Sequence, residues 1–317
     1  MSPKGGGRGD RLMVPEAEFE SYYGKQIIKT PTWKTPDVPL YLFLGGMAGA
    51  SALLAEGAAL LDLPALEKVA RGAAATGAGL GTVALVHDLG RPERFLNMLR
   101  VFKPTSPLSV GSFILAPFSA FSTAALGSMV TGRFPRLGRL CGVGAAAFGP
   151  PLATYTAALV ANTAVPAWHE AHRELPFVFA GSGASAAGGL AMALAPVEQT
   201  GPAVRMALAG AALEVGAAEL MEKRLGMIAE PYEQGPSGRL MKVARGLTAA
   251  GVGLSLLGRR SRAARVAAGA AYVAGSVTLR FGIFEAGLAS ARDPKYTVVP
   301  QKERIAAREA ARAAAPR

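Results

Sequence analysis

The sequence has few of the residues that bind metals or haem. It contains one cysteine, Cys141, and three histidines in 317 residues. One thiol forms no disulfide within the chain, and an iron–sulfur cluster needs about four thiolates. A haem in a membrane is usually held by histidines on facing helices, whereas His169 and His172 fall in an expected connector. We therefore expect neither a haem nor a metal site in this chain.

Charged and aromatic residues are also scarce. They make up 18% and 7% of the chain, while 50% of the residues are hydrophobic. Soluble domains carry about 25% charged residues. Glycine is abundant, with 39 residues, and small residues suit helices that pack closely in lipid. This composition excludes a soluble domain and predicts an all-α integral membrane protein.

The charges that are present are mostly positive, with a formal net charge of +12. Such a charge can indicate nucleic-acid binding. Here, however, the basic residues lie in the tails and between apolar segments, as in loops that face anionic lipid. We therefore expect these basic residues to face a lipid bilayer and to bind no nucleic acid. The expected location is the cell (plasma) membrane, crossed several times.

Long apolar runs dominate the rest of the chain. A bilayer core of about 30 Å is crossed by about 20 helical residues. Eight segments meet this requirement: 38–61, 66–88, 108–130, 142–165, 175–195, 201–221, 240–257 and 264–289. The seventh is the weakest, because Lys242 and Arg245 enter its first turns.

The eight segments divide evenly. We expect two four-helix bundles, over 38–165 and 166–289, between extra-membrane tails at 1–37 and 290–317. An even number of crossings places both tails on one face of the membrane, together with the longer connectors. The connector 89–107 is the candidate docking surface for a partner protein on that face.

Ionisable residues inside membrane helices are costly and often functional. The expected helices contain five such candidates: Glu56, Glu214, Glu219, Arg280 and Glu285. They could form a path for protons. Alternatively, Arg280 could pair with Glu214 or Glu219 between helices and so lower the cost of burying each charge. The sequence leaves both interpretations open.

A second polar group lies near the ends of the first two expected helices. His87 and Asp88 end the second helix and could transfer protons near neutral pH, or they could simply cap that helix. Tyr41 and Tyr155 are phenols within apolar runs, and a phenol can donate a hydrogen bond to a quinone carbonyl. Tyrosines also line membrane interfaces. Asp37 precedes Tyr41 by one helical turn, so both can face one cavity.

Several segments resemble the NrfD/PsrC-type membrane subunits of polysulfide reductase and related molybdenum enzymes. The strongest are Asp-Leu-Gly-Arg-Pro-Glu-Arg-Phe at 88–95 and Pro-Thr-Ser-Pro-Leu-Ser-Val-Gly at 104–111. Supporting segments are 41–46 and 155–156. The resemblance covers 14–303 and is greatest to actinobacterial members that accompany formate-dehydrogenase-like subunits.

This resemblance implies a site for menaquinone or another quinone in the first bundle. Tyr155 matches the family tyrosine that contacts quinone. Asp37 and Tyr41 stand where polysulfide reductase has an asparagine and a histidine. His87 and Asp88 lie where some relatives are thought to move protons.

The resemblance also implies two partner proteins, a ferredoxin-like four-cluster iron–sulfur subunit and a molybdopterin catalytic subunit. The chain would then be a membrane anchor that exchanges electrons between the iron–sulfur subunit and the quinone pool, with the catalytic centre of the complex on the partner. Two alternatives stay open: a proton- or ion-translocating subunit that uses the buried Glu and Arg residues, and a purely structural anchor.

Overall fold

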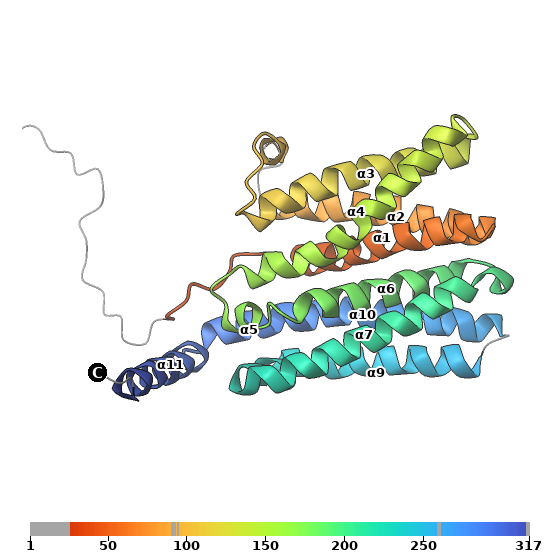
Figure 1. Cartoon of the computed structure of the whole chain (residues 1–317). Coiled ribbons are helices and arrows are strands. Elements are labelled where there is room, and N and C mark those ends of the chain that lie inside the picture. Colours follow the sequence, from red (N-terminus) through yellow and green to blue (C-terminus); the bar gives the residue numbers. More distant parts are fainter. Residues whose placement is uncertain (1–25, 90–92, 94, 259–260, 315–317) are drawn as a thin grey trace, which may run out of the picture.

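The protein folds into long helices that run side by side (Figure 1). The computed structural model describes residues 26–89, 93, 95–258 and 261–314. Within these residues there is no β-strand, as the composition predicts. The eight long helices are α1 (Asp37–Leu60), α2 (Pro64–Asp88), α3 (Pro107–Thr131), α4 (Pro135–Ala161), α6 (Leu175–Leu194), α7 (Gly201–Leu225), α9 (Gly235–Leu257) and α10 (Arg262–Arg292).

The other described elements are short, except for a C-terminal helix of 20 residues. They are the α-helices α5 (Pro166–Glu170) and α8 (Glu230–Glu233), the 3-10 helices Leu96–Leu99, Val197–Gln199 and Gly226–Ala229, and the C-terminal helix α11 (Lys295–Ala314).

Seven of the eight long helices have the length and apolarity of a membrane crossing. The exception is α7, because its 25 residues include charged ones such as Arg205, Glu214 and Glu219. It nevertheless packs along α6. The expected weak segment around Lys242 qualifies as part of α9. The multi-pass membrane prediction is confirmed, with α7 as the helix that composition alone does not identify as a span.

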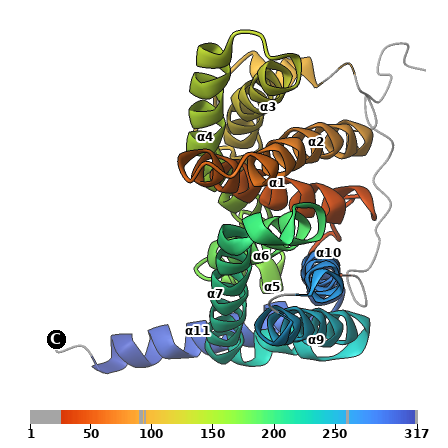
Figure 2. The same ribbon diagram turned by 90° about the vertical axis from the view of Figure 1, so that its right-hand side faces the viewer.

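The long helices form two groups (Figure 1). Helices α1 to α4 lie together above α6, α7, α9 and α10. The same pairing occurs in each group: α1 packs on α2 and α4 as α6 packs on α7 and α10. Figure 2 shows α1 and α6 in the middle of the molecule, where they pack against each other. Both described ends of the chain lie at the left end of Figure 1, beside α5 and α11.

Local sequence explains where these helices begin and end. Prolines occupy the first turns of α2, α3 and α4, where a missing backbone N–H breaks no helical hydrogen bond. Helix α3 ends at Gly132, whose φ of 68° is left-handed. Such a conformation favours glycine just beyond a helix C-terminus.

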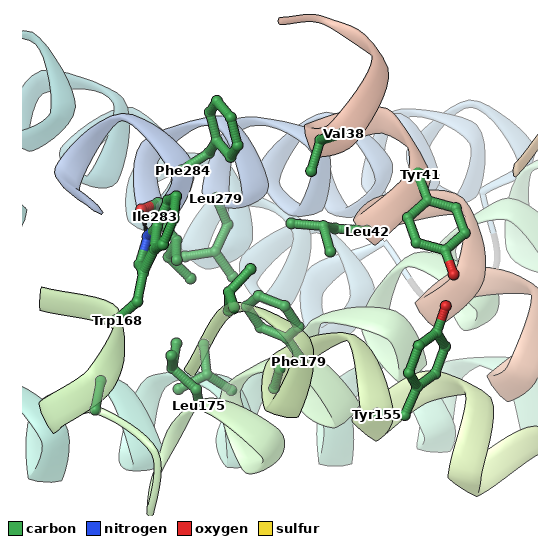
Figure 3. Close-up of a cluster of buried hydrophobic side chains, with 14 of the residues drawn as sticks. Val38, Tyr41, Leu42, Tyr155, Trp168, Leu175, Phe179, Leu279, Ile283 and Phe284 are labelled. Atoms are coloured by element: carbon green, nitrogen blue, oxygen red, sulfur yellow. Dashed lines mark hydrogen bonds between the residues drawn. The ribbon is translucent and has the colours of Figure 1, made fainter. Parts of the chain in front are cut away.

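A tryptophan anchors the chain at the end where the termini lie. The Trp168 ring stacks on Trp33 with 5.5 Å between ring centroids. Its Nε1 donates a hydrogen bond to the Ile283 carbonyl oxygen at 2.8 Å. Trp168 and Ile283 are seen together in Figure 3. The segment that leads into α1 is thereby attached to α10.

Helices meet most closely at glycines. A Cβ at Gly49 of α1 would overlap the carbonyl oxygen of Gly149 of α4, and the reverse holds equally. Gly189 of α6 and Gly269 of α10 make a similar contact. In lipid, burying apolar surface drives helix association only weakly. Close packing of backbones therefore contributes more to holding the helices together.

This contact gives a stability test. Gly49→Ala should lower the free energy of unfolding by about 1–3 kcal/mol, because the added methyl group overpacks the α1–α4 crossing. The measurement is thermal unfolding of the purified protein in detergent. Gly57→Ala on the same helix is the control, since its Cβ would meet nothing within 4 Å. Equal unfolding temperatures for the two variants would contradict the close-contact interpretation.

Candidate functional site

Two tyrosines face each other inside the first group of helices. Tyr41 of α1 and Tyr155 of α4 are 2% and 8% exposed, and their rings meet edge-on with 6.5 Å between centroids. Figure 3 shows their phenol oxygens directed toward one another. The Tyr41 hydroxyl has no hydrogen-bond partner among the described residues. Leaving a buried hydroxyl unpaired costs about 1–3 kcal/mol, so a ligand or water that pairs with it would be stabilised.

The position of the Tyr155 ring depends on a glycine of α3. A Cβ at Gly111 would overlap the carbons of that ring. Gly111 ends the segment 104–111 that carries much of the family resemblance. The ring therefore lies against bare backbone, and any side chain at this position would displace it.

A pocket of about 370 Å³ opens beside Tyr155. It lies between the beginning of α3 and the end of α4 and combines apolar walls with a few polar groups. Its lining residues are Pro104, Thr105, Pro107, Val110, Tyr155, Ala158 and Asn162. This size and composition suit a small, mostly apolar ligand that is oriented by a few hydrogen bonds.

A polar pair links the interior to the surface. His87 Nδ1 lies 2.7 Å from Asp37 Oδ2. The His87 side chain is 72% exposed, whereas that of Asp37 is only 15% exposed. Asp37 lies one helical turn before Tyr41 on α1 and on the same face. The Asp37 carboxyl thus contacts an exposed imidazole and belongs to the helix face that carries Tyr41.

Asp88 has a different environment from its neighbour His87. Its carboxylate accepts a hydrogen bond from the backbone N–H of Lys34 at 2.9 Å. The Lys34 ammonium in turn donates to the His87 carbonyl oxygen at 3.3 Å. Asp88 thus fastens the chain before α1 to the end of α2, which is a structural contact. Its role in proton transfer stays a prediction.

The five candidate membrane charges are dispersed. Glu56 lies near the opposite end of α1 from Asp37, where its carboxylate is 2.7 Å from Arg71 Nη2 and 3.8 Å from Arg139 Nε. Arg71 also binds Glu67 at 2.8 Å. This cluster is an ion-paired network at the end of the bundle.

Of these five candidates, Glu214 and Arg280 are deeply buried, with 3% and 0% exposure. Glu285 is half-buried and Glu219 is exposed. The expectation of a buried Glu219 is therefore not met. Two residues that are five positions apart in an α-helix are separated by roughly 140° around its axis. The Glu219 side chain therefore projects from a different face of α7 than that of Glu214. The five residues do not line one continuous path.

Sequence reasoning missed several residues of this site. Thr156 is fully buried and its hydroxyl has no partner among the described residues. Thr105 and Asn162 line the pocket, and Gly111 supports the Tyr155 ring. Thr105 and Gly111 fall in the segment 104–111 that carries the family resemblance, and this was the available signal for them. Asn162, just past the end of α4, gave none.

The expected docking connector lies at the same end of the molecule as the pocket. Residues 90–92 and 94 of the quoted segment 88–95 are outside the described residues. The described part exposes large apolar side chains: Leu96, Val101 and Phe102. Phe102 also packs edge-on against Phe113 of α3, with ring centroids 5.1 Å apart.

Comparison with known protein families identifies one match. Residues 27–201, more than half of the chain, match the family described as "Polysulphide reductase, NrfD". This range begins before α1 and ends at the first residue of α7, so it contains Tyr41, Tyr155 and the pocket. No curated protein matches the chain.

Proposed function

Because the chain belongs to the NrfD polysulphide reductase family, we propose that it exchanges electrons between a partner iron–sulfur subunit and membrane quinone at the Tyr41–Tyr155 site. Members of this family are membrane subunits of molybdoenzyme complexes and interact with quinone. The observation that carries the proposal is the unpartnered Tyr41 phenol beside Tyr155 and its pocket. Two phenols are suitable donors to the carbonyl oxygens of a quinone.

The pocket beside Tyr155 suits a quinone head-group. Its walls of proline, valine and alanine offer apolar contact, and Thr105, Tyr155 and Asn162 offer hydrogen bonds. In this proposal menaquinone, or another quinone, is the substrate and exchanges two electrons and two protons per turnover. The chain's own residues orient the head-group and carry the protons.

The Asp37–His87 pair provides a route for those protons. Asp37 lies one turn from Tyr41, and its carboxylate is 2.7 Å from the exposed His87 ring. A proton at the phenol would pass by way of a bridging water to Asp37 and then through His87 to bulk water, or in the reverse direction when quinone is reduced. Imidazole is suited to this task because its ordinary pKa lies near neutrality.

The partners follow from the same proposal. The exposed Leu96, Val101 and Phe102 lie close in sequence to the pocket residues Pro104 and Thr105. An iron–sulfur subunit that covers these apolar side chains would place a cluster near the quinone. That subunit would in turn serve a molybdopterin catalytic subunit of the formate-dehydrogenase-like class.

Tyr155→Phe tests the site directly. Loss of the hydroxyl should slow quinone-linked turnover by about tenfold or more, because a positioned donor to the substrate is removed. The measurement is turnover of the purified complex with a quinol or quinone, beside turnover with a soluble dye that bypasses the membrane subunit. Tyr272→Phe, which removes a buried phenol of α10, is the matched control. Equal quinone-linked rates for the two variants would exclude Tyr155 from the site.

Gly111→Ala tests the same site without touching a polar group. The added methyl group must displace the Tyr155 ring, and we expect a loss of quinone-linked turnover of about tenfold or more from misplacement alone. Gly127→Ala on the same helix is the control, because its Cβ would meet nothing within 4 Å. The idea fails if both variants turn over quinone at the wild-type rate.

Asp37→Asn tests the proton route. The amide keeps the shape of the carboxyl but accepts no proton near neutrality, so turnover with quinone should fall by about tenfold or more. Asp62→Asn, at the other end of α1 just past its last residue, is the matched control. A wild-type rate in Asp37→Asn across the pH range of activity would rule out proton transfer through Asp37.

A further inference from the structure

A buried polar cluster lies in the second group of helices, and each of the four helices contributes to it. The members are Glu214 of α7, Thr248 of α9, Ser182 of α6, and Ser276 and Arg280 of α10. Thr248 donates a hydrogen bond to the Glu214 carboxylate at 3.1 Å. The hydroxyls of Ser182 and Ser276 are 2.8 Å apart. Apart from Ser182, these residues lie outside the range matched by the family.

Arg280 extends from this cluster into the contact between the two groups of helices. Its Nη2 donates to the Phe179 carbonyl oxygen of α6 at 2.8 Å, and its Nε to the Leu42 carbonyl oxygen of α1 at 3.4 Å. The guanidinium carbon lies 3.7 Å from the centre of the Phe179 ring. Arg280 therefore touches three helices: its own, α6 and α1.

Space for the guanidinium is provided by a glycine of α1. A Cβ at Gly46 would lie 3.2 Å from Arg280 Nη2, which is closer than carbon and nitrogen atoms normally approach. Gly46 lies one helical turn after Leu42, so the guanidinium rests against one turn of α1. The same Cβ position would also lie 3.6 Å from the Cα of Gly183 in α6.

A buried cation needs compensation. The two carbonyl oxygens and the Phe179 ring compensate part of the charge of Arg280, while its Nη1 has no hydrogen-bond partner among the described residues. Burying a charge far from any opposite charge is costly, so loss of the Glu214 carboxylate should make Arg280 more costly to bury. Arg280 thus bonds the turn of α1 that begins at Leu42, and Glu214 is the carboxylate of the same buried cluster.

Tyr41 is the residue of α1 immediately before Leu42. We infer that Arg280 is a positioning residue that fixes this turn of α1 and thereby the Tyr41 phenol relative to Tyr155. The inference rests on the proposed function of the two tyrosines as a quinone site. It gives the second group of helices a part in a reaction that takes place in the first.

The test uses Arg280→Lys and Glu214→Gln in the whole purified complex. Both should raise the KM for quinol or quinone by about tenfold, since small displacements of a positioned group have effects of this order or larger. Turnover with a soluble dye should not change. Glu219→Gln is the matched control, because it makes the same chemical change on an exposed face of α7. Tyr41→Phe should raise the KM as well.

A double-mutant cycle then separates positioning from general damage. If Arg280 acts through the Tyr41 phenol, adding Arg280→Lys to Tyr41→Phe should raise the KM no further, because coupled residues are not additive. The inference would be overturned if the KM of the double variant rose by the product of the two single fold-changes, or if the KM were unchanged in both Arg280→Lys and Glu214→Gln. Either result would leave the proposed quinone site intact. An unchanged KM in Tyr41→Phe and Tyr155→Phe alike would overturn the quinone site, and the inference with it.

The accumulation of the variants completes the test. If the Arg280→Lys complex does not assemble, the KM of Glu214→Gln is used to test the inference. If neither assembles while Glu219→Gln does, the pair acts in folding alone and the positioning role is overturned.

Discussion

The contact of bare backbone at Gly49 and Gly149 sets the geometry on which the site depends. Helices α1 and α4 run in opposite directions and cross at these two glycines. Tyr41 precedes the crossing by eight residues on α1, and Tyr155 follows it by six on α4. At about 1.5 Å of rise per residue, both phenols lie at nearly the same height. The distance between them is thus fixed by how closely two backbones approach, and no direct bond between the tyrosines is needed.

The surrounding lipid explains the distribution of charge. Unpaired charge is expensive in a bilayer, so the charges of α1 and α2 gather at the two ends of this helix pair. Asp37 pairs with His87 at one end, and Glu56 pairs with Arg71 at the other. The exceptions are Glu214 and Arg280, which lie deep among helices, where carbonyl oxygens and an aromatic ring replace water around Arg280. A charge kept at such a depth must be held by several helices at once.

The sequence predicts the helices well because bilayer thickness dictates their length and apolarity. It predicts contacts between them poorly. Helices such as α1 carry apolar residues on nearly every face, so the periodicity of the sequence does not show which face packs on which neighbouring helix. Asp37 and Tyr41 share a face by simple spacing, but the pairing of Asp37 with His87 joins residues fifty positions apart. His87 and Asp88 appear equivalent in sequence, yet they leave α2 in different directions and bind different groups.

The second group of helices is therefore more than a scaffold. Its helix α6 packs on α1 at Gly183 and Gly46, which provides the close contact that a membrane interface needs. Close packing alone would leave α1 free to slide or rotate, because glycines present no side chain to interlock. A guanidinium that binds the Leu42 carbonyl oxygen opposes both motions, since its bonds have direction and its charge has no nearby aqueous alternative. The glycines bring the two groups together, and Arg280 fixes their relative position at the turn that carries Tyr41.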